Sequence, residues 1–220
     1  MLTGGAAMAE ILKINPQQPE PERMARAAAS LWQGEVIAIP TDTFYGLAAN
    51  PFDLSAVEKI FAIKGRDKSQ PLLLLVDSLK MAAELAADLP GNFRSLAKRF
   101  WPGPLTIVVE AASKIPPLVT GHSGRIGLRL PSAPLAVALI KEAKFPLTAT
   151  SANRAGEREC TTAEQVHAQL GERLALIVDG GTCRAKSPST VLDLGPDSWT
   201  ILREGAVPRS AIETFFRTGS

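Results

Sequence analysis

The sequence predicts an α/β domain with a mixed sheet, and three observations carry that prediction. Short aliphatic and β-branched runs, typical of strands, recur along the whole chain. Stretches with helical periodicity lie between many of them. Some neighbouring strand-like runs have no such stretch between them, so strand and helix do not strictly alternate. We therefore expect a sheet with parallel and antiparallel pairs, flanked by helices, rather than a doubly wound parallel sheet.

The composition is that of an ordinary globular protein. Of the 220 residues, 45% are hydrophobic and 21% are charged. A chain of this length can bury a core without disulfides or structural metals. No change in composition marks an internal boundary, so we expect residues 11–220 to form one domain and residues 1–10 to be a flexible tail. The two cysteines, Cys160 and Cys183, match no zinc or redox spacing.

Charge and hydropathy narrow the class of function. The formal net charge is only +2, so any phosphate or nucleic-acid site has to come from local clustering of Lys and Arg. The N-terminal residues lack the basic and apolar regions of a signal peptide, and no apolar run is long enough to span a bilayer. We expect a cytoplasmic protein in a reducing compartment, with no membrane partner.

Helix ends carry recognisable signals. Pro21 suits the first turn of a helix, and Gly34 can end that helix. Asp53 can cap the next helix. The segment Thr161-Thr162-Ala163-Glu164 contains a T-x-x-E capping box. We expect helices at residues 24–32, 53–63, 79–87, 93–100, 134–143, 161–171 and 209–216.

The strand predictions rest on apolar runs and on alternation. Residues 72–76 form a continuous apolar run, which favours a strand buried on both faces. In residues 125–130, apolar Ile126, Leu128 and Leu130 alternate with other residues. Residues 11–14 can form an edge strand. We expect further strands at residues 35–39, 105–110, 147–150, 174–178, 190–194 and 200–202.

Several common catalytic motifs are absent from the sequence. It contains no P-loop, no G-x-G-x-x-G after a strand, no H-E-x-x-H and no G-x-S-x-G. The two histidines, His122 and His167, lie in no recognisable motif, and we interpret them as loop and helix-surface residues. The remaining candidates are polar residues at strand ends, where ligands bind in α/β sheets.

The first two candidate groups each allow two interpretations. Thr41-Asp42-Thr43 follows a predicted strand, and these side chains can bind a polar ligand or satisfy the backbone of a turn. Lys64, Arg66 and Lys68 follow a predicted helix. They can form a solvated helix end, where positive charge suits the dipole, or clamp a phosphate chain. In the second case we expect Lys64 and Arg66 to lie on an exposed rim.

The other candidates lie at the ends of later strands. Ser151 and Asn153 can bond a phosphate or ribose, or cap a turn. Residues 187–190 lead into a strand, and Arg203 follows the last one. Arg125 and Arg129 are four residues apart in one predicted strand, so both can point into one cleft.

The joint order of these motifs is more specific than any single one. The chain reads P-T-D-T-x-Y-G-L, K-x-R, W-P-G-P-L-T, L-R-L-P, S-A-N, S-P-S-T-V-x-D and L-R-x-G, over about residues 11–216. This series resembles the YrdC family of threonylcarbamoyl-AMP synthases, in its short single-domain form. The resemblance implies an α/β domain with a twisted mixed sheet around a basic concave cleft.

The resemblance also implies an activity. Enzymes of this family use ATP, L-threonine and bicarbonate, with Mg²⁺, to make threonylcarbamoyl-adenylate and pyrophosphate. Other tRNA-modification proteins then use the adenylate to form threonylcarbamoyladenosine. Lys64 and Arg66 are the catalytic candidates by this resemblance, and no protein metal ligand is assigned. The implied ATP contacts are Lys64, Arg66, Lys68, Arg125, Ser151, Asn153 and Arg203. The implied L-threonine contacts are Thr41, Thr106, Arg129 and Ser189.

One departure and two alternatives accompany this interpretation. Many relatives carry a histidine in the strand after K-x-R, whereas residues 72–76 contain none. The same cleft can instead serve a double-stranded RNA or tRNA-binding module, whose affinity would fall steeply with salt. A carbamoyltransferase of the hydrogenase-maturation type is disfavoured, because the chain has no C-x-x-C pair of the kind found in the zinc-finger domains of that branch.

Overall fold

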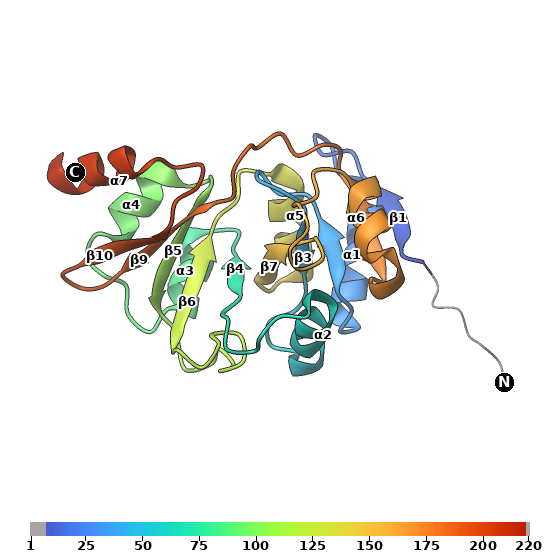
Figure 1. The fold of residues 1–220 in the computed structure, drawn as a ribbon, viewed down its shortest axis with the longest axis horizontal. Coiled ribbons are helices and arrows are strands. Elements are labelled where there is room, and N and C mark those ends of the chain that lie inside the picture. The colour runs from blue at the N-terminus through green and yellow to red at the C-terminus, as the bar shows by residue number, and fades with distance from the viewer. Residues whose placement is uncertain (1–7, 219–220) are drawn as a thin grey trace.

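The computed structural model describes residues 8–218 as a ten-stranded sheet with helices packed on it (Figure 1). The strands are β1 (Glu10–Lys13), β2 (Ile37–Ile39), β3 (Gly46–Ala48), β4 (Leu73–Leu75), β5 (Leu105–Glu110), β6 (Arg125–Arg129), β7 (Leu147–Ser151), β8 (Leu176–Asp179), β9 (Thr190–Leu194) and β10 (Trp199–Arg203). The helices are α1 (Pro21–Trp32), α2 (Leu54–Lys64), α3 (Leu79–Leu85), α4 (Phe93–Phe100), α5 (Pro134–Ala143), α6 (Ala163–Leu170) and α7 (Arg209–Thr218), with a 3₁₀ turn at Gly171–Arg173.

The sheet is mixed, as the sequence predicts. Its strand order is β1-β8-β2-β3-β7-β4-β6-β5-β9-β10. β8 pairs in parallel with β1 and β2, β4 with β6, and β5 with β9. The pairs β2–β3, β3–β7, β4–β7, β5–β6 and β9–β10 are antiparallel. The middle strands therefore combine segments that lie far apart in the sequence.

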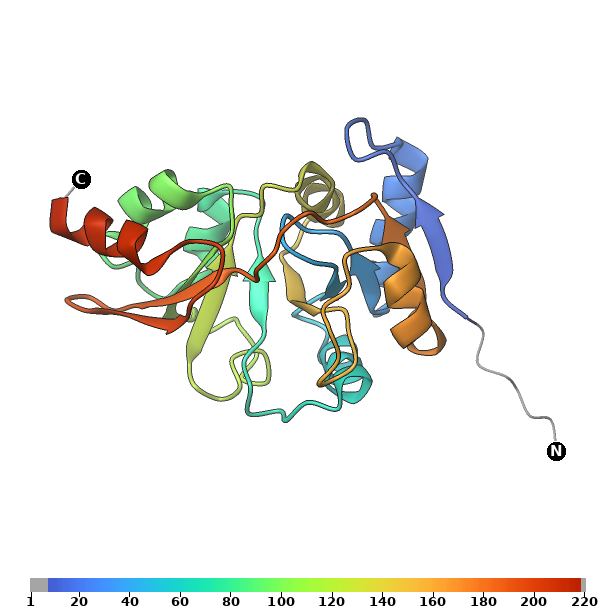
Figure 2. The same ribbon diagram turned by 45° about the horizontal axis from the view of Figure 1, so that its top comes forward.

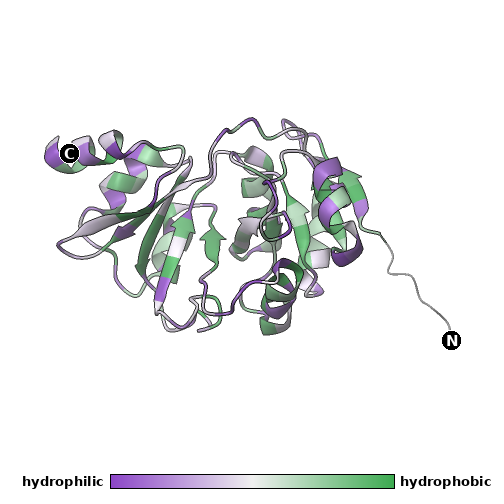
Figure 3. Cartoon of the chain, in the orientation of Figure 1, coloured by the Kyte–Doolittle hydropathy of each residue, from purple (hydrophilic) through white to green (hydrophobic). Residues whose placement is uncertain are grey.

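Two apolar clusters hold the helices to the sheet. The smaller joins α1 and α5 to β1, β2 and β8. The larger takes in α2, α3, α4, α6 and α7 with the inner residues of most strands. Two orientations of the ribbon show α3, α4 and α7 around one end of the sheet and α1, α2, α5 and α6 around the other (Figures 1 and 2). The hydropathy colouring agrees with this packing, since the strands are largely apolar and the outer faces of the helices are polar (Figure 3).

The N-terminus differs from the expected tail where the structure describes it. Residues 1–7 of that tail lie outside the described residues. Ala9 is buried, and its N–H donates to the carbonyl of Gly171 at 2.7 Å. β1 begins at Glu10, one residue before the expected start, and forms an edge of the sheet as predicted. The extent of the single domain stays a prediction.

Most expected helices and strands are present within a few residues of their predicted ends, and two details differ. β3 (Gly46–Ala48) was not expected, because a three-residue run that begins with glycine gives no alternation. The cap of α6 is Thr162, whose side chain accepts from the N–H of Gln165. The side chain of Gln165 accepts from the N–H of Thr161, the residue before the cap, at 2.8 Å, so the cap lies one residue later than predicted and the reciprocal bond of a capping box is not formed.

No helix within the described residues is both long and apolar enough to cross a membrane.

Candidate functional site

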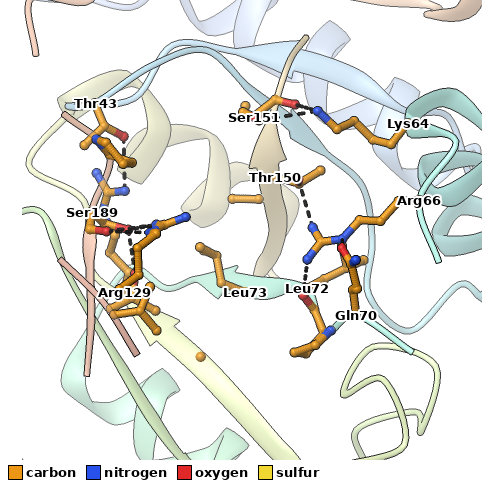
Figure 4. A pocket seen from close by; sticks show the side chains of 18 of the residues that line it. Thr43, Lys64, Arg66, Gln70, Leu72, Leu73, Arg129, Thr150, Ser151 and Ser189 are labelled. Carbon is orange, nitrogen blue, oxygen red and sulfur yellow. Dashed lines mark hydrogen bonds between the residues drawn. The ribbon is translucent and has the colours of Figure 1, made fainter. Parts of the chain in front are cut away.

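A cavity of about 790 Å³ lies over the middle of the sheet. Its floor is formed by β4, β5 and β6. One wall comes from the end of α2, residues 65–67 and 70–72, the end of β7 and the loop after β7. The other comes from the loop before β3, residues 188–193 and the end of β10 (Figure 4). Ligand pockets in proteins have volumes of about 300–1,000 Å³, so the cavity suits a small molecule of nucleotide size.

The floor follows the alternation of side chains along the strands. In β6, Arg125, Gly127 and Arg129 line the cavity, whereas Ile126 and Leu128 are buried in the core on the opposite face. β5 behaves in the same way, since Thr106 and Val108 line the cavity, whereas Leu105, Ile107 and Val109 pack in the core. The prediction that Arg125 and Arg129 point into one cleft is confirmed.

Lys64 is buried in the first wall rather than exposed on a rim. It is the last residue of α2, which ends because Gly65 adopts a left-handed conformation with φ of 58°. Its Nζ donates to the carbonyl of Ser151 at 2.8 Å and to the carbonyl and Oδ1 of Asn153 at 2.7 and 2.8 Å. The expected exposed position was wrong for Lys64, because its ammonium ties α2 to the Ser-Ala-Asn segment.

Burial and the nearby Arg66 lower the pKa of Lys64 from 10.5 to about 8. The group is therefore a cation at neutral pH and titrates in the mildly alkaline range.

Arg66 lies in the same wall with its guanidinium fixed on three edges (Figure 4). Its Nε donates to Gln70 Oε1 at 2.7 Å, its Nη1 to Thr150 Oγ1 at 3.2 Å and its Nη2 to the carbonyl of Pro71 at 3.1 Å. Burial and then the charge of Arg203 lower the pKa of Arg66. Since Arg203 comes from the opposite wall, the positive charge of the two walls converges on the cavity.

In the opposite wall, Arg203 holds a pair of buried hydroxyls. Its Nη2 donates to the carbonyl of Ser189 at 2.8 Å and to Ser189 Oγ at 3.1 Å. Ser189 Oγ lies 2.9 Å from Thr106 Oγ1. A side chain at Gly205 would place its Cβ 2.3 Å from the carbonyl oxygen of Pro188, so only glycine allows this close approach of the two segments.

Arg129 is the most buried cation of the cavity, with a side chain 4% exposed. Its Nε donates to the carbonyl of Gly103 and its Nη1 to Thr43 Oγ1, both at 3.2 Å. Its Nη2 forms an ion pair with Asp42 Oδ1. Thr43 Oγ1 can then donate to Thr41 Oγ1, 3.0 Å away, which donates to the carbonyl of Phe44 at 2.7 Å.

Ten of the eleven predicted site residues line the cavity. They are Thr41, Lys64, Arg66, Thr106, Arg125, Arg129, Ser151, Asn153, Ser189 and Arg203. The exception is Lys68, an exposed residue outside the lining whose Nζ pairs with Glu58 Oε1 at 2.9 Å. The side chain of Arg125 is only partly buried and forms an ion pair with Asp193.

Three residues that support the site were not among the predicted site residues. Gln70 and Thr150 line the cavity and orient Arg66, and Asp42 pairs with Arg129 from outside the lining. The motif P-T-D-T pointed to Asp42, but nothing local indicated its partner, which lies 87 positions away.

The arrangement favours an anionic ligand. Lys64, Arg66, Arg129 and Arg203 face one space, and burial is the first cause of the lowered pKa of each. Among the described residues the lining contains neither histidine nor cysteine, and neither His122 nor His167 lies at the cavity. The residues can therefore bind and orient a phosphate or carboxylate ligand and stabilise negative charge that develops on it.

Comparison with known proteins agrees with this geometry. The family model Sua5/YciO/YrdC, described as telomere recombination, matches residues 29–205. The chain belongs to the Sua5/YciO/YrdC family. The matched residues include most of the sheet and the whole cavity lining.

Two curated relatives and one solved structure are similar to most of the chain. It is 40% identical over 192 residues to the threonylcarbamoyl-AMP synthase of Bacillus subtilis, covering 87% of this chain and 56% of that protein. It is 38% identical over 187 residues to that of Pyrococcus abyssi, covering 85% and 55%. The crystal structure of P. abyssi Sua5 complexed with L-threonine superposes with a TM-score of 0.90 at 35% identity, covering 94% of this chain and 60% of that one.

The likeness to this structure confirms the predicted fold. The chain spans about half the length of these curated relatives.

Proposed function

We propose that this chain is a threonylcarbamoyl-AMP synthase, which makes threonylcarbamoyl-adenylate and pyrophosphate from ATP, L-threonine and bicarbonate. The observation that carries the proposal is the convergence of cations from both walls on a nucleotide-sized cavity. The names of the relatives support it, as does the binding of L-threonine by P. abyssi Sua5.

The proposed chemistry needs no protein nucleophile. The amine of L-threonine combines with bicarbonate, losing water, to give a carbamate. A carbamate oxygen then attacks the α-phosphorus of ATP, and the bond to the β-phosphate oxygen breaks to release pyrophosphate. The substrates supply every group that reacts, so the protein has to bring them together and offset the developing charge. A lining of fixed arginines, hydroxyls and one lysine is suited to that task.

We assign the first wall to ATP. Arg66 presents a planar guanidinium, and Lys64 adds a charge while it holds Ser151 and Asn153 in place. Arg125 and Arg203 complete the proposed ATP contacts from the other side of the cavity. Lys68 is not among them, because its ammonium pairs with Glu58 outside the lining.

We assign the opposite end of the cavity to L-threonine. Arg129 is the proposed partner of its carboxylate, since a guanidinium binds a carboxylate with two parallel hydrogen bonds. The hydroxyls of Thr41, Thr106 and Ser189 line the same region and can bond the amine and hydroxyl of the amino acid.

Mg²⁺ is proposed to enter with ATP. Among the described residues no group of three or more His, Cys, Asp or Glu side chains could hold a metal ion. Mg²⁺ bound to ATP needs only one or two protein carboxylates besides the phosphates and water. Asp67 and Glu159 line the cavity and can serve, directly or through water. The ion would neutralise phosphate charge.

We further propose that the adenylate passes to tRNA-modification proteins in the cytoplasm. A mixed carbamic–phosphoric anhydride is a reactive product, so an acceptor enzyme has to consume it. The sequence also allowed a double-stranded RNA or tRNA-binding module, but the small volume of the cavity favours the enzyme.

A pyrophosphate-release assay tests the proposal. The purified protein is incubated with ATP, Mg²⁺, bicarbonate and L-threonine, and each component is omitted in turn. We expect release only in the complete mixture. Release that does not depend on L-threonine, or none at all, would contradict the proposal. An RNA-binding module would instead bind an RNA duplex with steep salt dependence and without competition from ATP.

A further inference from the structure

Asp42 is unusual among the described residues because it carries their only buried side-chain oxygen or nitrogen without a hydrogen-bond partner. That atom is Oδ2, while Oδ1 pairs with Arg129. The side chain is 10% exposed and does not line the cavity. Leaving a buried charged oxygen unsatisfied costs stability. A residue of this kind is better explained by an effect on the neighbouring site than by a gain in stability.

The turn that carries Asp42 is held firmly. Thr41 Oγ1 accepts from the N–H of Thr43 at 3.1 Å and donates to the carbonyl of Phe44. These bonds join the two ends of the turn between β2 and β3, and they fix the direction in which Asp42 leaves the backbone. The carboxylate therefore reaches the end of β6 from a defined position, behind the guanidinium of Arg129.

Arg129 uses three of its five N–H bonds within the protein. Nε donates to Gly103, one N–H of Nη1 to Thr43 and one N–H of Nη2 to Asp42. One N–H thus remains on each terminal nitrogen. Because Arg129 lines the cavity, these two remaining N–H bonds, here called the fork, are the ones left to bind a carboxylate in it.

We propose that Asp42 is a positioning residue that holds Arg129 in the orientation needed to bind the carboxylate of the amino-acid substrate. This rests on the proposed function for the identity of that substrate. Asp42 acts through Arg129 and does not touch the ligand. Without its acceptor the guanidinium keeps two weaker neutral contacts, and rotation about its side-chain torsions turns the fork away from the cavity.

The test compares carboxylate recognition in two variants. Asp42→Ala removes the acceptor of Nη2, whereas Asp42→Asn keeps an oxygen acceptor and loses only the charge. Binding of L-threonine, of L-threoninamide and of ATP with Mg²⁺ is measured by isothermal titration calorimetry. L-threoninamide lacks the carboxylate, so the ratio of the two amino-acid affinities reports the fork alone.

We expect Asp42→Ala to weaken L-threonine binding by about tenfold or more, as for a charge-assisted hydrogen bond, with ATP affinity unchanged. The preference for L-threonine over L-threoninamide should largely disappear in that variant. Asp42→Asn should keep both the affinity and the preference. Glu58→Ala is the matched control, because it removes the acidic partner of Lys68 outside the cavity. It should leave L-threonine affinity unchanged.

Each other outcome has a distinct meaning. If the unchanged protein does not bind L-threonine, the proposed function fails. If it binds and Asp42→Ala keeps the preference for the carboxylate, the positioning role is wrong, whatever happens to stability. If Asp42→Ala does not fold, Asp42→Asn decides, because loss of the preference in a folded Asp42→Asn protein contradicts the role of the oxygen acceptor.

Discussion

At the scale of single residues, Lys64 joins a structural and a binding role. Three short hydrogen bonds connect its ammonium to Ser151 and Asn153, which lie 87 and 89 residues further along the chain. One side chain therefore fixes the K-x-R motif against the S-A-N motif. The sequence predicted both motifs and their common cavity. It could not predict that they contact each other, because each is compatible with an exposed loop when considered alone.

Replacing Lys64 tests this double role. In Lys64→Met the acceptors on Ser151 and Asn153 lose their donor, and we expect a loss of about 2–4 kcal/mol in the free energy of unfolding. ATP affinity should fall by about tenfold or more. Urea unfolding and calorimetry measure the two effects. Lys68→Met is the matched control, since Lys68 is exposed and outside the cavity. Equal effects of the two changes would contradict the role of Lys64.

The lowered pKa of Lys64 predicts that its contribution to folding stability and the affinity for ATP change in opposite directions as the pH rises. The folded-state pKa is about 8, against 10.5 for an ordinary lysine. Folding therefore favours the neutral amine, and the contribution of Lys64 to stability rises as the pH increases from about 8 to 10.5. ATP binding favours the ammonium, so the affinity for ATP should fall as the pH rises through about 8.

Calorimetric titration of ATP between about pH 7 and 9.5 measures this fall in affinity. Phosphate groups have a second pKa of about 6, so the ligand keeps its charge over this pH range. Burial raises the pKa of Cys160 and of Cys183 to about 11, so these thiols do not titrate in the window. The fall in ATP affinity with rising pH should persist in Lys68→Met and be absent in Lys64→Met. A decline of equal size in Lys64→Met would assign it to another group.

At the scale of elements, the positions predicted from the sequence were most accurate where a helix end or an alternation of side chains has a local cause. The Asp53 cap is present, since its side chain accepts from the N–H groups of Ser55 and Ala56. The alternation in β6 places its arginines as expected. β3 was missed because its three residues are held by pairing with β2 and β7, which no local pattern indicates.

The segment after β10 offers a test at the same scale. Gly205 packs so closely on residues 188–190 that an added Cβ would lie 2.7 Å from the carbonyl carbon of Ser189. Gly205→Ala should force the segment away and lower the free energy of unfolding by about 1–3 kcal/mol. ATP affinity should fall with it, because Arg203 is bound to Ser189.

Gly91→Ala serves as the control for this substitution. No heavy atom lies within 4 Å of the Cβ that it would add, and its φ is not in the left-handed region. Urea unfolding of the two variants should separate them clearly. A Gly205→Ala protein as stable as Gly91→Ala would show that the close approach is not required.

At the scale of the whole molecule, the cavity exists because the strand order departs from the chain order. β4, β6 and β5 form the floor although they come from the middle of the chain, and the walls combine α2 with β7 and β9 with β10. The sequence predicted a mixed sheet and most of the lining residues, the latter through the order of the motifs. It could not predict the pairings β4–β7 and β5–β9, because long-range pairing depends on the packing of both faces.

The proposed function requires that one cavity joins ATP, L-threonine and bicarbonate in a single product. The most direct measurement is mass spectrometry of the adenylate formed when the purified protein acts on ATP, Mg²⁺, L-threonine and ¹³C-bicarbonate. We expect threonylcarbamoyl-adenylate that carries the label in its carbamoyl carbon, with an equal amount of pyrophosphate. Formation of threonyl-adenylate without the labelled carbon, or of no adenylate in the complete mixture, would contradict it.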